Sequence, residues 1–381
     1  MRIKLKLALT FIIIPFLSFA QKSRISRYQH LLIGTYTKTQ NNGIFVYKFD
    51  TKTGRLAFES KAEGINNPSY LAINQEGNKV YSVNESGADR KGGVSSFDLD
   101  TKNGNISFIN KQETLGSGPC YISIANDNKF IFTANYGSGS ISVLPLKIDG
   151  SVGKLSQLIQ HDGSSVNKSR QTAPHTHSVI FSNDGKTLFS ANLGTDKLHA
   201  YDYDSSFEKP LQNSAQPFVN IEPGFGPRHF VFNKNGDKLY LLSEMSAVIT
   251  IFDYKDKVLT KVKNVNLDQE GFSRTNGAAD IHLSNDGNFL YATNRGDVNE
   301  IVIFKVNKTD GSLSRVGSQS TMGKTPRNFM IDPTDNFLLV ANQNSDDIYI
   351  FKRNKKTGLL TYNNEMLKVG SPVCLKMTAV K

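Results

Sequence analysis

The chain has little cysteine. Cys120 and Cys374 are the two cysteines among its 381 residues, and each lies next to or near a proline at the expected start of a strand. Two cysteines are far too few for a disulfide scaffold of the kind that stabilises small exported domains. We therefore expect two buried free thiols, and a fold that depends on its hydrophobic core.

Long runs of like charge are also absent. The formal net charge is +11, from 45 basic and 34 acidic residues, and the excess is spread along the chain. A scattered excess argues against a groove that binds nucleic acid and weakly favours a small anionic ligand or surface. With 38% hydrophobic and 21% charged residues, the chain is globular rather than disordered.

The one extended apolar run lies at the N-terminus, over residues 7–17, and small residues close it at 18–20. Three basic residues precede it: Arg2, Lys4 and Lys6. This arrangement predicts a signal peptide over residues 1–20, with cleavage before Gln21. The run falls short of the roughly 20 apolar residues that a spanning helix needs, so we expect no stable membrane anchor. The protein is expected to be exported, to the periplasm or outside the cell.

A hairpin pattern repeats along the rest of the chain. In residues 227–243, apolar positions alternate on either side of Asn235-Gly236, which supplies the positive φ angles of a tight β-turn. The pattern recurs, with its ends sixteen positions apart, over residues 68–84, 119–135, 176–192, 278–294 and 326–342. A third strand follows most copies, and a Gly-x-Leu turn leads into a fourth in several. Each repeat is thus a four-stranded unit of about fifty residues, the size of a propeller blade.

The two ends of the chain carry complementary parts of one more blade. Residues 31–36, 44–49 and 56–60 match the second to fourth strands of the repeat, and residues 372–377 match a first strand. Pairing them closes the ring and removes exposed sheet edges. The sequence therefore predicts an all-β fold, a single seven-bladed β-propeller over residues 21–381 in which the C-terminal strand completes the N-terminal blade. An open solenoid or a two-domain sandwich would not explain the complementary ends.

Two columns of the repeat are expected to meet at one end of the central channel. The first column opens the innermost strand and reads Ser69, Cys120, His177, Arg228, Ala279, Arg327 and Val373. The second ends the second strand and reads Tyr36, Glu85, Tyr136, Leu193, Glu244, Arg295 and Gln343. Titratable side chains gather in four consecutive blades: His177, Arg228, Glu244, Arg295 and Arg327. A rim built only for packing would not gather charges in this way, so we expect a functional site.

Each of these residues also has a structural interpretation. Arg228 and Glu244 alone would more often be an ion pair that ties the sheet together, and His177 alone could be a histidine of the rim. The asparagines at the ends of the second strands are expected to bond backbone groups. The conjunction of charges in adjacent blades is what favours function.

The same residues stand in motifs that resemble those of the seven-bladed propeller lactonases. The motifs are Arg170-Gln171, Pro174-His175-Thr176-His177-Ser178, Gly226-Pro227-Arg228-His229, Ser243-Glu244 and Thr293-Asn294-Arg295-Gly296. The resemblance covers essentially the whole chain after residue 20. That family includes bacterial 6-phosphogluconolactonase and is similar in fold to fungal carboxy-cis,cis-muconate cyclase. Asn192 departs from the family, which is expected to carry aspartate there.

The resemblance implies a lactonase site built from His177, Arg228, Glu244 and Arg295, acting without a cofactor. Lactone hydrolysis needs a base that activates water and a cation that stabilises the oxyanion. Glu244 is the first candidate base, with His177 as the alternative or as its partner. The arginines suit a phosphate or carboxylate and the developing charge.

Two further residues, His175 and Arg327, are expected to bind substrate, with His175 lining the mouth of the channel. A Ca²⁺ site at Glu244 and the neighbouring asparagines is a weaker alternative, because arginines beside the carboxylate would repel a divalent cation.

The substrate stays open at this point. A phosphorylated lactone belongs in the cytoplasm, whereas the expected export favours an unphosphorylated aldonolactone or another substrate. A cyclase or lyase acting on a carboxylated dienoic acid and a non-catalytic propeller that binds a ligand or partner are the alternatives.

Overall fold

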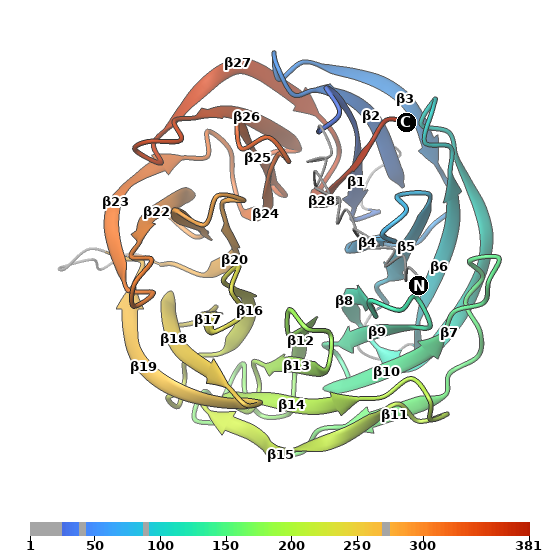
Figure 1. The fold of residues 1–381 in the computed structure, drawn as a ribbon, viewed down its shortest axis with the longest axis vertical. Helices are drawn as coiled ribbons and strands as arrows, with labels where there is room; N and C mark the ends of the chain where they lie inside the picture. The colour runs from blue at the N-terminus through green and yellow to red at the C-terminus, as the bar shows by residue number, and fades with distance from the viewer. Residues whose placement is uncertain (1–24, 38–42, 87–90, 269–274) are drawn as a thin grey trace, which may run out of the picture.

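Seven four-stranded antiparallel sheets stand around a common axis in the computed structural model (Figure 1). The structure describes residues 25–37, 43–86, 91–268 and 275–381. These ranges contain strands and no helix, and hence no helix that could cross a membrane. The predicted signal peptide over residues 1–20 lies outside the described residues.

The blades are numbered along the chain, and each strand order runs from the axis outward. Blade 1 contains β28 (Pro372–Ala379), β1 (Tyr28–Thr35), β2 (Ile44–Asp50) and β3 (Leu56–Ala62). Blade 2 contains β4 (Leu71–Ile73), β5 (Lys79–Asn84), β6 (Lys91–Leu99) and β7 (Ile106–Ser117). Blade 3 contains β8 (Pro119–Ile124), β9 (Phe130–Asn135), β10 (Ser140–Pro145) and β11 (Gln157–Gln160). Blade 4 contains β12 (Thr176–Phe181), β13 (Thr187–Asn192), β14 (Lys197–Tyr203) and β15 (Leu211–Asn220).

The remaining three blades follow the same order. Blade 5 contains β16 (Pro227–Phe232), β17 (Lys238–Ser243), β18 (Val248–Lys255) and β19 (Val258–Asn266). Blade 6 contains β20 (Ala278–Leu283), β21 (Phe289–Asn294), β22 (Glu300–Val306) and β23 (Leu313–Ser320). Blade 7 contains β24 (Pro326–Ile331), β25 (Phe337–Asn342), β26 (Asp347–Arg353) and β27 (Leu360–Lys368). The predicted seven-bladed all-β propeller is confirmed.

Ring closure follows the prediction from the complementary ends. β28 pairs antiparallel with β1, with Ile33 opposite Leu375 and Leu31 opposite Met377. The amide of Tyr36 continues the contact by donating to the carbonyl of Ser371 at 3.0 Å. The C-terminal strand β28 is therefore the innermost strand of the blade that contains β1, the first described strand (Figure 1).

The core lies between neighbouring blades, which pack face to face. Between blades 6 and 7, for example, Ile301 and Ile303 pack in one cluster with Leu338, Val340 and Phe351. Second strands such as β9, β13, β21 and β25 are buried at every position, because a blade covers each of their faces. Burial of both faces explains why these strands contain no charged residue, while the outermost strands are partly exposed.

Candidate active site

A β-bulge at the start of the inner strand places the first column of side chains. In blade 5, Pro227 pairs with Ser243 and His229 with Leu242, so Arg228 is an extra residue in its strand. The same shift occurs at Cys120, His177 and Arg327. An extra residue bends the strand and redirects its side chain, a device common beside active sites. The site residues therefore lie at the end of the ring where the inner strands begin.

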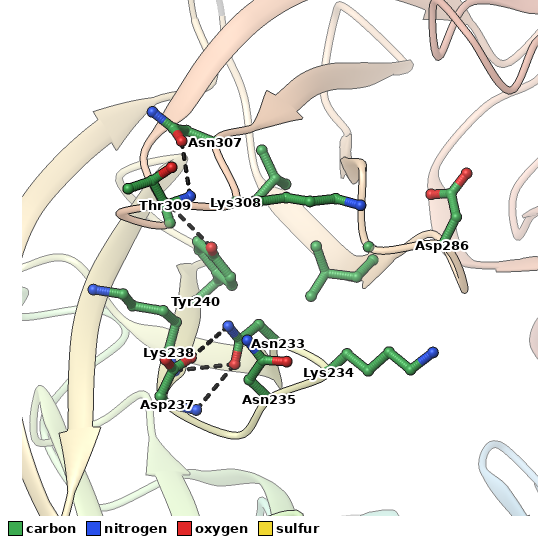
Figure 2. Close-up of a pocket in the computed structure, with 14 residues that line it drawn as sticks. Asn233, Lys234, Asn235, Asp237, Lys238, Tyr240, Asp286, Asn307, Lys308 and Thr309 are labelled. Carbon is green, nitrogen blue, oxygen red and sulfur yellow. Dashed lines mark hydrogen bonds between the residues drawn. The ribbon is translucent and has the colours of Figure 1, made fainter.

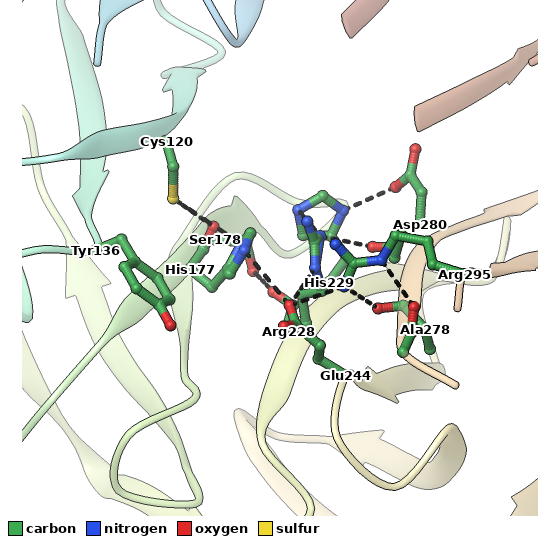
Figure 3. A network of polar contacts seen from close by, with 12 residues as sticks. Cys120, Tyr136, His177, Ser178, Arg228, His229, Glu244, Ala278, Asp280 and Arg295 are labelled. Carbon is green, nitrogen blue, oxygen red and sulfur yellow. Dashed lines mark hydrogen bonds and ion pairs between the residues drawn. The ribbon is translucent and has the colours of Figure 1, made fainter. Parts of the chain in front are cut away.

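The carboxylate of Glu244, directly after β17, is the centre of the site (Figure 3). Its Oε2 accepts a hydrogen bond from Nε of Arg228 at 2.8 Å and lies 3.2 Å from Nη2 of Arg295. Its Oε1 accepts from Nη2 of Arg170 at 2.8 Å. The Glu244 side chain is 11% exposed, so three guanidinium groups share one nearly buried carboxylate.

These contacts set the charge state of Glu244. Burial alone would raise its pKa, but Arg295, Arg228 and Arg170 outweigh burial and lower the pKa to about 2. The side chain is thus a carboxylate throughout the neutral range and a weak proton acceptor. The part of Glu244 as general base stays a prediction, and its surroundings favour a second role, as the counter-charge that holds the arginines.

In the guanidinium groups of Arg228 and Arg295, some nitrogens are hydrogen-bonded to the protein and others are not. Nη1 of Arg228 donates to the carbonyl of Ala279 at 2.7 Å, while Nε is bonded to Glu244. Nε of Arg295 donates to the carbonyl of Gly277 at 2.8 Å, and Nη2 to that of Ala278 at 3.1 Å. Among the described residues, Nη2 of Arg228 and Nη1 of Arg295 have no hydrogen-bond acceptor. Burial and the charge of Arg295 lower the pKa of Arg228 to about 10, so it keeps its charge at neutral pH.

His177 lies beside this cluster in blade 4. Its Nε2 is 3.9 Å from Oε2 of Glu244, and its Nδ1 is 3.9 Å from Sγ of Cys120, both longer than ordinary hydrogen bonds. Burial and the charge of Arg228 hold the pKa of His177 well below its usual value, so the ring is neutral at neutral pH. A neutral imidazole with an uncommitted nitrogen can accept a proton from water.

Both cysteines are buried and unpaired, as the sequence predicts. Burial raises the pKa of Cys120 to about 12 and that of Cys374 to about 11. A nucleophilic cysteine needs a lowered pKa. Although Cys120 borders His177, it is therefore a packing residue and no nucleophile.

His175 contacts Tyr136, which in turn borders Arg170 and His177. Its ring stacks on Tyr136 at 4.5 Å, and its Nδ1 lies 2.9 Å from the Tyr136 carbonyl oxygen. Its amide donates to Oδ1 of Asn192 at 2.9 Å, while Nδ2 of Asn192 donates to Nδ1 of His161 at 2.9 Å. An aspartate at position 192 could accept but not donate, so asparagine suits a site whose neighbour His161 offers an acceptor.

Arg327 borders the site from blade 7. Its guanidinium lies over the ring of Tyr36 at 5.4 Å, and within the described ranges it makes no hydrogen bond or ion pair. Tyr36 in turn donates from its hydroxyl to the carboxylate of Glu85, at 3.0 and 3.1 Å. Burial would lower the pKa of Arg327, but Tyr36 and Glu85 outweigh it, so the group is firmly cationic. Arg327 is open to an anionic or polyhydroxyl ligand.

One residue of the cluster escaped the repeat analysis. Arg170 lies between β11 and β12, outside the register, and the sole sequence signal for it was the Arg170-Gln171 motif of the family. Its neighbour Gln171 fixes the segment, because Nε2 of Gln171 donates to the Leu193 carbonyl and to Oδ2 of Asp196, both at 2.8 Å. Asp196 also accepts from the amides of Gly224 and Gly226 at 2.7 Å, and so ties this segment to the turn before Arg228.

A cavity of about 150 Å³ lies elsewhere, between blades 5 and 6 (Figure 2). The β16–β17 turn and the turn after β22 line it, with Asn233, Lys234 and Lys308 among the lining residues. Arg228 and Glu244 lie at the opposite end of the β16–β17 hairpin, so this cavity does not border the site. Within the described ranges, no group of three or more His, Cys, Asp or Glu side chains could hold a metal ion.

Comparison with known proteins shows the family to which the chain belongs. The family described as lactonase, 7-bladed β-propeller, matches residues 30–377. The chain belongs to this lactonase family. Proteins named 6-phosphogluconolactonase from Formosa agariphila and Bacillus subtilis are 35% and 33% identical to it. The alignments cover 91% and 90% of this chain and 99% and 97% of those proteins.

A solved structure supports the same membership. The structure described as the periplasmic gluconolactonase of Pseudomonas aeruginosa is 37% identical, with a TM-score of 0.89. The match covers 93% of this chain and all of that one. The chain is thus a lactonase, a carboxylic ester hydrolase, and its substrate is a small molecule.

Proposed function

We propose that this member of the lactonase family hydrolyses a sugar-derived aldonolactone to its acid, at the end of the ring where the inner strands begin. The observation that carries the proposal is the convergence of three arginines and a neutral histidine on one nearly buried carboxylate. Such a group of side chains offers both a proton acceptor and cations for an oxyanion.

In the proposed reaction, His177 takes a proton from a water molecule as the water attacks the lactone carbonyl. The carbonyl oxygen becomes an oxyanion, which accepts hydrogen bonds from Nη2 of Arg228 and Nη1 of Arg295. The ring C–O bond then breaks, and the imidazolium returns its proton to the leaving alkoxide. Water and lactone thereby give a hydroxy acid, whose carboxyl group releases a proton at neutral pH.

Glu244 has two tasks in this scheme. Its negative charge, 3.9 Å from Nε2 of His177, stabilises the imidazolium while that ring holds the proton. Its three ion pairs also keep Arg170, Arg228 and Arg295 in place without the cost of bringing together unpaired cations. Both carboxylate oxygens of Glu244 already accept hydrogen bonds from arginines, whereas the nearest polar contact of Nε2 of His177 among the described residues is the 3.9 Å approach to Glu244.

Arg327 supplies the remaining recognition in this proposal. Its guanidinium lies over the ring of Tyr36, and its donors are open to hydroxyl oxygens or an anionic group of the substrate. Two relatives carry the name 6-phosphogluconolactonase and one is described as a gluconolactonase. The presence of a phosphate is therefore the main point to test.

Export bears on this point. Residues 1–20 have the basic start, apolar centre and small-residue end of a signal peptide, and the similar protein from Pseudomonas aeruginosa is described as periplasmic. We propose that the protein is exported without a stable anchor and acts on an unphosphorylated aldonolactone. Mass spectrometry of the protein from an exporting host should find Gln21 as the first residue. Membrane-bound protein that retains residues 1–20 would contradict cleavage before Gln21 and the lack of a stable anchor.

The deciding assay is hydrolysis of glucono-δ-lactone and of 6-phosphogluconolactone by the mature protein, followed as acid release in a pH-stat. We expect both to be cleaved, with the higher kcat/KM for the unphosphorylated lactone. A chelator should leave the rates unchanged, because the arginines around Glu244 repel divalent cations. If neither lactone is cleaved and a carboxylated dienoic acid is converted instead, the cyclase alternative replaces the proposal.

A further inference from the structure

A second chain of polar contacts starts at Arg228 and leads away from Glu244, through the wall formed by the inner strands. Nη1 of Arg228 lies 3.3 Å from Nε2 of His229, the next residue in β16. Nδ1 of His229 lies 2.8 Å from Oδ1 of Asp280 in blade 6 (Figure 3). Both side chains are buried, and neither has a part in the reaction described above.

These contacts determine which nitrogen of His229 carries the proton. A carboxylate oxygen can only accept, so Nδ1 of His229 must donate to Asp280. Burial and the charge of Arg228 lower the pKa of His229 to about 4, so Nε2 carries no second proton at neutral pH. Nε2 therefore accepts from Nη1 of Arg228. A protonated His229 would instead place a cation against the guanidinium.

Asp280 is itself held rigidly. Its Oδ1 also accepts from the amide of Ile281 at 3.1 Å. Its Oδ2 accepts from Nδ2 of Asn328 at 2.5 Å, from Nε2 of His282 at 3.0 Å and from the amide of Phe329 at 3.3 Å. His282, one-third exposed, borders a cavity of about 240 Å³ with Asp280 and His229. Because these donors come from two blades, Asp280 gives His229 a fixed acceptor.

Packing fixes the ring of His229 as well. It makes edge contacts with Tyr121 and with His177, each with centroids 5.2 Å apart. A ring held by two aromatic neighbours and at one nitrogen presents its other nitrogen in one direction. Arg228 thus donates from Nε to Glu244, and from Nη1 to Ala279 and His229. Its Nη2 is the nitrogen that remains available to a substrate.

We propose that His229, held by Asp280, is a positioning residue that orients the guanidinium of Arg228 toward the developing oxyanion. The inference rests on the proposed function, in which Arg228 stabilises that charge. His229 does not touch the substrate. It acts through Arg228, and its importance comes from the accepting nitrogen rather than from the bulk of the ring.

Three variants separate these contributions. His229→Phe keeps an aromatic ring between Tyr121 and His177 but removes the acceptor for Arg228. His229→Gln restores one donor and one acceptor, as Asp280 and Arg228 require. His282→Phe is the matched control, because it also removes a donor from Asp280 but has no contact with Arg228. The measurements are kcat and KM for glucono-δ-lactone, Tm, and the position of Arg228 in crystal structures of the variants.

We expect His229→Phe to lower kcat roughly ten- to a hundredfold with little change in KM, as misplacement of a group in the transition state does. His229→Gln should recover most of the rate, and His282→Phe should retain it. A folded His229→Phe protein with the kcat of the wild type would overturn the inference. So would equal losses of kcat and Tm in His229→Phe and His282→Phe, which would indicate a structural role.

The crystal structures test the inference even if the wild type cleaves no lactone, in which case the proposed function fails separately. In the crystal structure of His229→Phe, we expect the guanidinium of Arg228 to have lost its hydrogen bond to the carbonyl of Ala279 or to the carboxylate of Glu244. If Arg228 keeps both contacts, His229 does not position it, whatever the activity.

Discussion

Replacement of Glu244 by glutamine is the most informative single change, because it removes one negative charge from the midst of three positive ones. The lowering of the Glu244 pKa from about 4.5 to about 2 measures how much the folded protein favours the carboxylate. At about 1.4 kcal/mol for each factor of ten, it corresponds to about 3 kcal/mol of stability at neutral pH. Glu244→Gln should therefore lower the free energy of unfolding by about that amount at pH 7.

The pH dependence gives the sign of the effect. A carboxylate whose pKa is lower in the folded state stabilises the protein above its unfolded pKa, and loses that contribution as the pH falls through the folded one. The difference between wild type and Glu244→Gln should thus be constant between pH 7 and about pH 5. It should shrink below about pH 4.5 and vanish near pH 2. Urea unfolding at several pH values measures it.

The catalytic effect is measured on the same protein. Without the carboxylate, His177 loses the charge that stabilises its imidazolium and the arginines lose their common anchor, so kcat should fall by roughly a hundred- to ten-thousandfold. Asp202→Asn is the control, since Asp202 pairs with Lys257 at 2.9 Å on the surface and its loss should change the stability by less than about 1 kcal/mol. A Glu244→Gln protein that loses stability yet turns over normally per folded molecule would leave Glu244 as a structural ion pair. One that is normal in both would refute the reasoning.

Three further changes test the rest of the site and the fold. His177→Gln should lower kcat by roughly a hundred- to ten-thousandfold without changing Tm. Because burial lowers the His177 pKa, the kcat/KM of the wild type should stay constant from neutral pH to well below pH 6.5. A fall of kcat/KM near pH 6.5 would indicate another base. Arg327→Gln should raise KM roughly tenfold or more, and the increase should be larger for 6-phosphogluconolactone than for glucono-δ-lactone if the open guanidinium binds the phosphate. KM values equal to those of the wild type would show that Arg327 does not bind the substrate. Truncation after Ser371 removes β28 and reopens the ring, so Tm should fall by about 10 °C or more, whereas an unchanged melting curve would mean that ring closure contributes little.

The fold was predictable because its signals are local and repeated. Each hairpin turn carries its own residues, and the spacing of sixteen positions places Arg228 and Glu244 at one end of the same unit. The unpaired strand pattern at residues 372–377 required its complement at residues 31–36. No knowledge of distances was needed for either conclusion.

The sequence indicates most of the residues that cluster at the site, but not how their side chains pair with one another. Its columns include His177, Arg228, Glu244 and Arg295, yet Arg170 comes from a segment between blades, where the repeat gives no register. The number of arginines on Glu244 depends on side-chain directions that bulges and packing decide. That number is what lowers the Glu244 pKa to about 2, which no repeat pattern could have indicated. The hydrogen bonds of Asn192 and His229 likewise depend on partners that are distant in the sequence, His161 for Asn192 and Asp280 for His229.

The pairing of β28 with β1 also sets an order of events during synthesis. Because a ribosome makes β1 first and β28 last, the first blade must wait for its inner strand while all the other blades are completed. Until then the edge of β1 is unpaired and open to other chains, a known route to aggregation. A nascent chain of this protein should therefore depend on chaperones, or on remaining unfolded, until β28 emerges.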